Sequence, residues 1–156
     1  MAYDFFGIPV SELNVWLIWI LPFAAAMIIP AVGKFSKLTT GRVAVAFAAM
    51  SAISAATLFP MALGAHEIHH QIMWIDAIGL KAGVLADPLS VIMSNVVGWI
   101  SFLIMCYSTG YMKGDKDITR FWFWMMFFIG SMQLIILSDN LLQVFFGWEG
   151  VGLASY

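Results

Sequence analysis

The chain has 156 residues, of which 62% are hydrophobic and 10% are charged, with a formal net charge of −2. Its apolar runs approach twenty residues in length, and a soluble core would not hide so much apolar surface. No basic cluster is present to hold phosphates, so a nucleic-acid partner is not expected. The sequence therefore predicts an all-α, polytopic integral membrane helix bundle, with about five transmembrane helices in a single domain over residues 1–156.

Two membrane spans are predicted in the N-terminal part of the chain. Residues 1–12 lack the basic start of a cleaved signal peptide. The first span is expected at about 13–32, where Pro22 and Pro30 predict a kink. The second is expected at about 43–63, whose many alanines and serines allow another helix to approach closely.

Residues 64–86 form the long loop of the chain, and they carry two features of their own. Short apolar stretches at 72–75 and 83–85 are predicted to pair as a small hairpin. The run His66-Glu67-Ile68-His69-His70 matches the H-E-x-x-H pattern, in which two histidines one helical turn apart bind zinc. A zinc site at His66 and His70 would need a helix and a third ligand. Polar loop histidines without metal are the favoured interpretation, and an intramembrane zinc metalloprotease is a distant alternative.

Three further spans are predicted after the loop, at about 88–109, 121–137 and 141–156. Asp87-Pro88 suits the first turn of the third span. The short turns at 34–42 and 113–120 hold six of the seven Lys and Arg residues, whereas the loop at 64–86 holds only Lys81. Because basic loops face the cytoplasm or its equivalent, the long loop and the turn at 138–140 are expected on the opposite side.

The last eighteen residues carry the candidate site. Asn140 and Gln143 have the spacing of a capping box, and Asp139 suits the positive end of a helix. Glu149 lies roughly 14 Å beyond that helix start, near the middle of a hydrocarbon layer about 30 Å thick. A carboxylate at this depth costs about 2.5 to 3.5 kcal/mol on insertion scales, so its presence needs a reason.

Two interpretations of Glu149 compete. In the first, it is a structural partner of a group on a neighbouring helix and only fixes packing. In the second, it carries a proton: burial favours its neutral form, an approaching cation favours its carboxylate, and moving the cation loads or releases the proton. Ionisable groups at this depth usually mark ion paths, which favours the carrier. Around Glu149, beside Trp148, the glycines Gly147, Gly150 and Gly152 leave room for water or for a close helix.

No cofactor is expected in the chain. Its lone cysteine, Cys106, lies within an apolar run, and there is neither a cysteine cluster for iron and sulfur nor a glycine-rich nucleotide loop. No Lys or Arg falls within a predicted span either. A cationic partner for Glu149 must therefore come from outside this sequence.

Five blocks, in order, resemble the largest antiporter-like subunit of respiratory complex I. They are Ala86-Asp87-Pro88-Leu89-Ser90, Tyr111-Met112-Lys113-Gly114, Arg120-Phe121, Ser138-Asp139-Asn140-Leu141-Leu142 and Gly147-Trp148-Glu149-Gly150-Val151-Gly152-Leu153-Ala154-Ser155-Tyr156. The last block is the most specific. The resemblance covers roughly residues 86–156 and implies the N-terminal third of a longer subunit, in which the acid matching Glu149 pairs with a lysine on a later helix.

This resemblance implies a proton-translocating membrane subunit of an NADH-quinone-type oxidoreductase, which couples quinone reduction to proton pumping. Quinone and iron–sulfur clusters would lie in partner subunits, in a prokaryotic plasma membrane or the mitochondrial inner membrane. The alternative is the large subunit of a multi-subunit sodium/proton antiporter, which shares the acid-bearing helix. The fifth span ends without a flanking charge, which indicates a shortened chain, and this stretch alone is not expected to pump.

Overall fold

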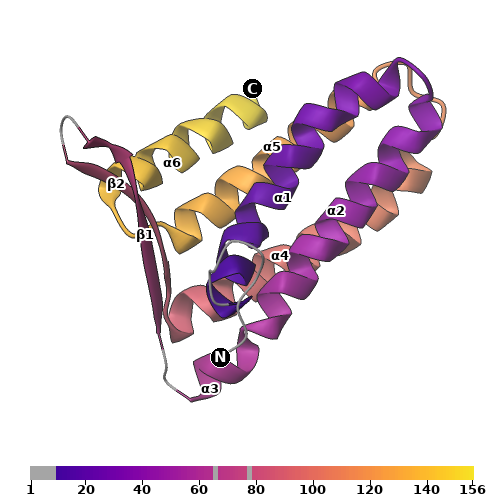
Figure 1. Cartoon of the computed structure of the whole chain (residues 1–156). Helices are drawn as coiled ribbons and strands as arrows, with labels where there is room; N and C mark the ends of the chain where they lie inside the picture. The colour runs from indigo at the N-terminus through magenta and orange to yellow at the C-terminus, as the bar shows by residue number, and fades with distance from the viewer. Residues whose placement is uncertain (1–9, 65–66, 77–78) are drawn as a thin grey trace.

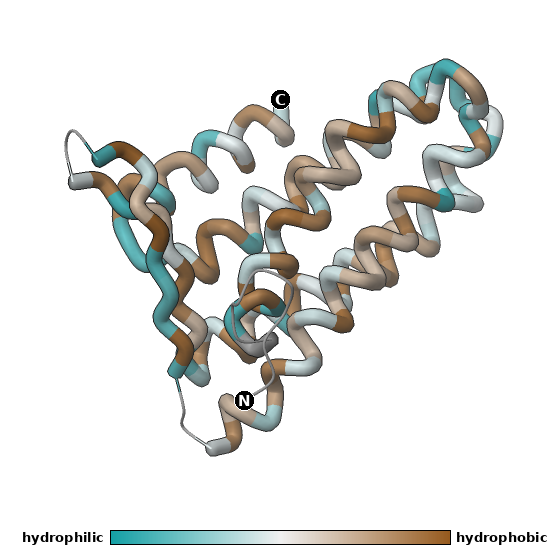
Figure 2. Tube along the Cα trace, viewed as in Figure 1, coloured by the Kyte–Doolittle hydropathy of each residue, from teal (hydrophilic) through white to brown (hydrophobic). Residues whose placement is uncertain are grey.

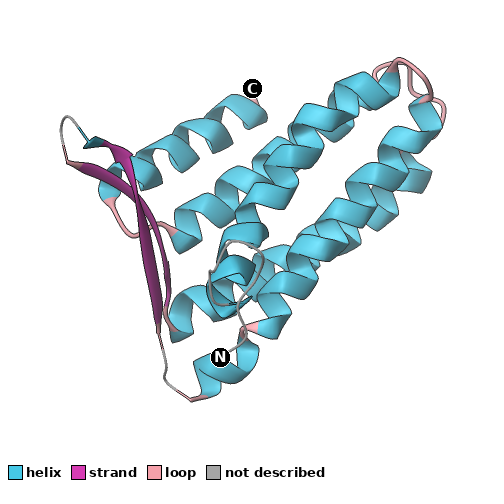
Figure 3. Ribbon diagram, in the orientation of Figure 1, coloured by secondary structure: helices cyan, strands magenta, loops and turns pink. Residues whose placement is uncertain are grey.

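The computed structural model describes residues 10–64, 67–76 and 79–156, and these are mostly helical (Figures 1 and 3). The helices are α1 (Val10–Gly33), α2 (Lys37–Thr57), α3 (Phe59–Leu63), α4 (Pro88–Tyr111), α5 (Ile118–Leu137) and α6 (Leu141–Ser155). Two strands, β1 (Ile68–Ile75) and β2 (Leu80–Ala86), form an antiparallel hairpin. The predicted helical membrane bundle is confirmed, with the hairpin as its one sheet among the described residues.

Four long helices close into a ring. Helix α1 packs against α2 and α5, and α4 completes the ring by packing against the same two helices. Helix α6 lies outside this ring, and it packs along α5 (Figure 1). One face of α6 is therefore covered by α5, its first turns also contact the hairpin, and the rest of its surface is open in this chain.

The ring helices are long and apolar enough to cross a membrane. Candidate spans run over Glu12–Gly33, Lys37–Leu63, Pro88–Tyr111 and Ile118–Leu137 among the described residues. At about 1.5 Å per residue, even the shortest of these approaches the thickness of a hydrocarbon layer of about 30 Å. Hydrophilic residues gather at the ends of the bundle and along the hairpin, whereas the middles of the helices are largely apolar (Figure 2). The chain is thus an integral membrane protein.

The predicted hairpin is confirmed, but its strands begin earlier and pair in a different register. Gln71 lies opposite Gly83, and Ile72 lies opposite Ala82. The turn sets this register: Gly79 has a φ of 65° and its N–H donates to the Asp76 carbonyl at 3.0 Å. Glycine adopts such a backbone without a Cβ penalty, so the chain reverses close after Asp76.

The second predicted span is divided in the structure. Helix α2 already begins at Lys37, capped by the Ser36 hydroxyl, which accepts from the Thr39 N–H at 3.4 Å. It ends at Thr57, and the short α3 follows with Pro60 in its first turn. Because proline has no N–H and clashes with the preceding turn, the helix is interrupted here rather than continued to Leu63.

Buried polar side chains join the ring helices. The Ser94 hydroxyl of α4 donates to the Gln133 side-chain oxygen of α5 at 2.8 Å, and Gln133 Nε2 donates back to the Ser94 carbonyl at 3.0 Å. Both residues are fully buried. On the other side of the ring, the Ser51 hydroxyl of α2 donates to the Ile18 carbonyl of α1 at 2.6 Å. Such bonds fix how the helices meet, because lipid offers no alternative partner.

Replacing Gln133 by methionine tests the contribution of the α4–α5 bonds. The change keeps the length of the side chain, but it leaves the Ser94 hydroxyl without its acceptor. We expect the free energy of unfolding to fall by about 1 to 2 kcal/mol, measured by detergent-induced unfolding. In a double-mutant cycle with Ser94→Ala, the two losses should not add, since both remove the same side-chain bond. If the two losses in the free energy of unfolding were fully additive, the hydrogen bond between the Ser94 and Gln133 side chains would not contribute to stability.

Candidate functional site

Helix α6 begins at a side-chain cap. The Asn140 side-chain oxygen accepts from the Gln143 N–H at 2.9 Å, so the predicted helix start is confirmed. The second hydrogen bond of the expected capping box, from the Asn140 backbone N–H to the Gln143 side chain, is not formed. The Gln143 side-chain oxygen accepts from the Gly83 N–H of β2 at 3.1 Å instead of binding the backbone of Asn140. The first turn of α6 is thus tied to the hairpin.

Two glycines hold α6 against α5. A Cβ atom added to Gly147 would lie 2.6 Å from Ile135 Cγ1 and 3.0 Å from the Ser131 carbonyl oxygen. A Cβ atom on Gly150 would meet the Ser131 hydroxyl at less than contact distance. Both glycines are buried. They therefore allow close contact between the two helices, which is the second of the two expected uses of these glycines, room for water or for a close helix.

Glu149 lies on the outer face of α6, away from α5. It is exposed in this chain, as is its neighbour Trp148, whose side chain is 69% exposed. Gly152 has open space around it, since no atom lies within 4 Å of an added Cβ. The structure therefore separates the predicted site residues into two groups: Gly147 and Gly150 face the bundle, whereas Trp148, Glu149 and Gly152 face outward.

The surroundings of Glu149 on this outer face are apolar. Residues three or four positions away along the helix lie beside it, and the large exposed ones are Phe145, Phe146, Leu153 and, further along, Tyr156. In the described part of the chain, the salt bridges all involve histidines, and none involves Glu149. A single carboxylate thus stands in an apolar stripe that a membrane or a further helix would cover.

Asp139 lies apart from Glu149, at the other end of α6, where it binds the hairpin. Its carboxylate accepts from Gln71 Nε2 at 2.6 Å, from Asn140 Nδ2 at 2.6 Å and lies 3.2 Å from His69 Nε2. The side chain is 2% exposed, and the absence of a side chain on Gly83 makes room for it. Trp74 of β1 also meets Phe146 of α6, with ring centroids 5.7 Å apart.

These contacts set the ionisation of Asp139. Burial raises its pKa, but the hydrogen bonds from Gln71, His69 and Asn140 outweigh burial and hold the pKa below the ordinary value of 3.8. We name the group formed by His69, Gln71, Asp139 and Asn140 the hairpin clamp. It holds the hairpin over the end of α5 and α6, which is a structural role that the sequence spacing did not reveal.

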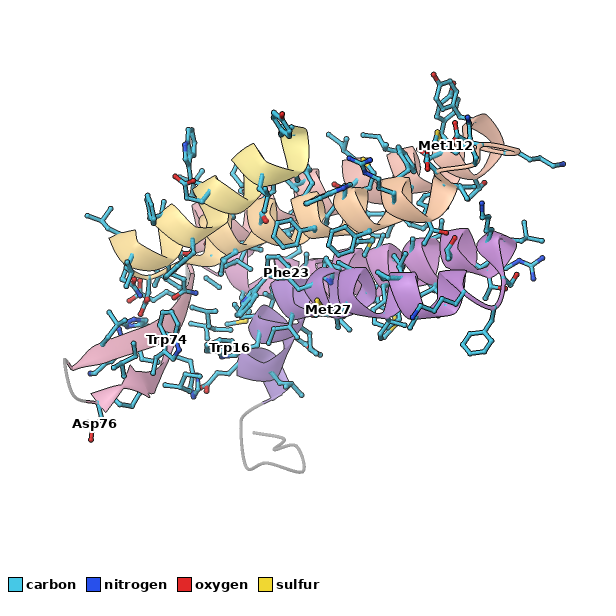
Figure 4. The ribbon with its side chains drawn as sticks, turned by 90° about the horizontal axis from the view of Figure 1, so that it is seen from above. Trp16, Phe23, Met27, Trp74, Asp76 and Met112 are labelled. Atoms are coloured by element: carbon cyan, nitrogen blue, oxygen red, sulfur yellow. The ribbon has the colours of Figure 1, made fainter. Side chains whose placement is uncertain are left out.

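The histidine motif does not form a helix where it is described. Ile68–Ile75 is a strand, so His69 and His70 point to opposite faces, and His66 lies outside the described residues. His70 Nδ1 accepts from the Trp16 indole at 3.1 Å, and its Nε2 lies 3.7 Å from Glu12 of α1. Figure 4 shows Trp16 lying toward the hairpin that also carries Trp74. No group of three metal-ligating side chains occurs in the described ranges.

Comparisons with known proteins match this chain to one family of membrane subunits. A family model described as "NADH-Ubiquinone oxidoreductase (complex I), chain 5 N-terminus" matches residues 73–122. NADH-quinone oxidoreductase subunit L of Rickettsia bellii (strain RML369-C) is 38% identical over 145 residues, which cover 90% of this chain and 23% of that protein. The chloroplastic NAD(P)H-quinone oxidoreductase subunit 5 of Spinacia oleracea is 34% identical, covering 90% of this chain and 20% of that protein.

A solved structure has the same fold. A chain in the structure of the Mrp complex from Dietzia sp. DQ12-45-1b superposes with a TM-score of 0.74 at 22% identity, covering 90% of this chain and 15% of that chain. The expected resemblance to antiporter-like subunits is confirmed, and it reaches into the first two spans as well as residues 86–156. The chain spans about a quarter of the length of the curated relatives it matches, somewhat less than the third expected.

Gly147→Ala tests the close contact between α5 and α6. The added methyl group would press on the backbone of Ser131 and Ile135, which cannot move aside easily, and we expect a loss of about 1 to 3 kcal/mol in the free energy of unfolding. Gly152→Ala is the matched control, since its methyl group enters open space and alanine favours a helix by about 1 kcal/mol. Detergent-induced unfolding of both variants gives the answer. Equal stability of the two variants would refute this contact.

Asp139→Ala tests the hairpin clamp. Without the carboxylate, three donors lose their acceptor, and we expect the Gly83 amide to exchange about tenfold faster near neutral pH, as measured by NMR. Asp76→Ala is the control, because Asp76 is exposed at the hairpin turn (Figure 4). Since the folded pKa of Asp139 lies below its unfolded value, its contribution is complete above the unfolded pKa of about 3.9 and is lost as the pH falls through the folded pKa. The difference in stability between wild type and Asp139→Ala should therefore shrink as the pH falls through the folded pKa of Asp139, and a constant difference would contradict the account.

Proposed function

We propose that this chain forms the N-terminal part of a proton-translocating membrane subunit in a complex I-like respiratory dehydrogenase, with Glu149 as a proton-carrying group. The similarity to complex I subunits supports the family of the assembly. The fold supports a membrane location, because four described helices are long and apolar enough to cross a bilayer. The position of Glu149 supports its role.

One observation carries the proposal: the only carboxylate on α6 faces outward from a stripe of apolar side chains. Gly147 and Gly150 bury the opposite face of the helix against α5, so α6 cannot turn Glu149 into the ring without losing that contact. Trp148 and Leu153, both more than half exposed, flank the acid with apolar surface. A helix from the remaining length of such a subunit would pack here, and it would place its own side chains against Glu149.

The chemistry follows from this placement. A carboxylic acid covered by apolar groups favours its neutral form, because the charged form loses its water. A cation that approaches on the covering helix favours the carboxylate and releases the proton, and its withdrawal favours proton uptake. This chain supplies the acid, the fixed orientation of α6 and the apolar surface that excludes water. The cation would belong to the covering helix.

The partners of the chain follow from the same proposal. Other membrane subunits of a complex I-like assembly would surround it within the bilayer. Quinone and the iron–sulfur clusters would reside in partner subunits, and this chain would take part only in moving the proton. Redox chemistry would then reach Glu149 through movement of the covering helix rather than through a cofactor bound here.

A sodium/proton antiporter subunit is the second candidate, favoured by the likeness of the fold to a chain of the Mrp complex. Glu149 would carry out the same proton transfer in that setting. The two candidates differ in their partners. Co-purification with subunits that bear quinone and iron–sulfur clusters supports the dehydrogenase, whereas small membrane subunits alone would support the antiporter.

Glu149→Gln, made in the complete assembly, tests the proposed role. Glutamine keeps the size of the side chain but cannot carry a proton, so we expect the rate of proton transfer through this subunit to fall by about a hundredfold, the lower end of the contribution of a positioned proton-transfer group. Proton uptake by inverted vesicles with a pH-sensitive dye measures it. Glu67→Gln is the control, since Glu67 is exposed beside the hairpin. Full pumping by Glu149→Gln would refute the role.

A further inference from the structure

A groove opens at the end of the bundle that carries the short basic turns. It has a volume of about 750 Å³, and it lies between the start of α2 and the turn that joins α4 to α5. We call it the basic groove. Its lining residues are Lys37, Leu38, Gly41, Arg42, Thr109, Gly110, Lys113, Gly114, Asp115, Lys116, Ile118 and Trp122.

Positive charge dominates the basic groove. Four of its lining side chains are basic, and the one carboxylate, Asp115, already accepts from the Asp117 N–H at 2.7 Å. Lys37 Nζ donates to the Lys116 carbonyl at 2.8 Å, which joins the two walls without neutralising either charge. No described Lys or Arg forms a salt bridge. The groove therefore has four basic side chains against a single carboxylate, and its net charge is positive.

An unpaired hydrogen-bond donor lies in the wall of the same groove. Trp122 is 1% exposed, and its ring packs so closely on Gly41 that an added Cβ there would lie 3.0 Å from it. The indole Nε1 is buried and has no hydrogen-bond partner among the described residues. A buried indole N–H usually has an acceptor, because an unpaired one costs free energy.

The start of α2 adds a third feature that favours an anion. A helix N-terminus carries a partial positive charge, which acidic side chains in the first turn usually offset. Here the first turn has no acidic residue and begins with Lys37. The N-terminal N–H groups and the basic side chains therefore repel one another at this end, and a bound phosphate would relieve that repulsion.

The level of the groove along the bundle points to the source of the phosphate. Phe35, in the turn before α2, is 91% exposed, and Tyr107 and Tyr111 near the end of α4 stack with ring centroids 5.8 Å apart. Exposed aromatic side chains of this kind lie at the level of lipid headgroups. Leu38 lines the groove as well, and its side chain is 67% exposed, so the groove also offers apolar surface.

We propose that the basic groove binds the phosphate headgroup of an anionic phospholipid from the leaflet on the side of the basic turns. Lys37, Arg42, Lys113 and Lys116 hold the phosphate, and the acyl chains follow the apolar side of α2 at Leu38. Basic pockets between transmembrane helices bind anionic headgroups in this way. The site lies at the opposite end of the bundle from the hairpin clamp, and it does not depend on the function of Glu149.

Lipid binding to the 156-residue chain in a neutral detergent tests the proposal. Dioleoylphosphatidylglycerol is titrated, and native mass spectrometry gives the dissociation constant of the first bound lipid. We expect Arg42→Gln with Lys113→Gln to weaken that binding about thirtyfold, from about 1 kcal/mol for each basic residue near a headgroup. The matched control, Lys34→Gln with Arg120→Gln, makes the same charge change at the same end but outside the groove, and it should weaken binding less than about threefold.

Two further binding measurements distinguish an anionic lipid from a zwitterionic lipid and from free phosphate. Dioleoylphosphatidylcholine should bind more weakly than the anionic lipid, and inorganic phosphate at the same concentration should not displace the lipid. Circular dichroism verifies that both double variants retain their helix content. Equal losses in the two double variants would show a general surface attraction and overturn the site. Full displacement by inorganic phosphate would overturn the lipid as its occupant.

Discussion

The contact between α5 and α6 determines what the candidate site can do. Gly147 and Gly150 bring α6 close to the Ser131 and Ile135 region of α5, and no side chain larger than hydrogen fits between the helices. An α-helix has about 3.6 residues per turn, so Glu149, two positions after Gly147 and one before Gly150, lies on the side of α6 away from this contact. Gly147 and Gly150 thus act mainly by fixing the orientation of α6. An acid on a freely rotating helix would have no fixed partner, whereas this one faces a single direction.

The two ends of the bundle support that orientation by different means. At one end, the hairpin clamp and the bond from Gly83 to Gln143 hold the first turn of α6, next to the buried contacts of α5. At the other end, α2 and the α4–α5 turn bring basic side chains together around a groove. Between these ends, the bonds of Ser94 and Gln133 tie the ring helices to one another. The result is a closed ring of packed helices with a single outlying helix, whose open face carries the acid.

Much of the fold was predictable from the sequence, because a membrane allows few choices of backbone. Long apolar runs must become helices, and proline at position 88 and the polar residues at 140 and 143 mark helix starts that the structure contains. The extension of α2 back to Lys37 was not predictable from hydropathy, since a helix continues into the headgroup region where charged residues are accepted. The sequence also predicted that the two basic turns lie on the same side of the membrane. In the structure they meet, because Lys37 Nζ donates a hydrogen bond to the Lys116 carbonyl.

The site was less predictable, because side-chain partners come from distant parts of the chain. Asp139 has the position of a helix-start residue in the sequence, yet its partners are His69 and Gln71, about seventy positions earlier. The glycines around Glu149 were expected to leave room for water or for a close helix, and only the packing of α5 shows that Gly147 and Gly150 admit a helix. Gln133 gave no signal, since a lone polar residue in an apolar run has no pattern, and the aromatic run at 121–124 did not show that Trp122 is buried. The hairpin register likewise depended on the backbone of Gly79.

Infrared difference spectroscopy of the working assembly addresses the charge of Glu149 directly. The spectra would be recorded with isotope-labelled glutamate during NADH oxidation in a reconstituted bilayer. A carbonyl band of a protonated carboxyl that appears and disappears with turnover, and that is missing from the glutamine variant, is the expected result. A side chain that stays ionised throughout turnover would contradict the account.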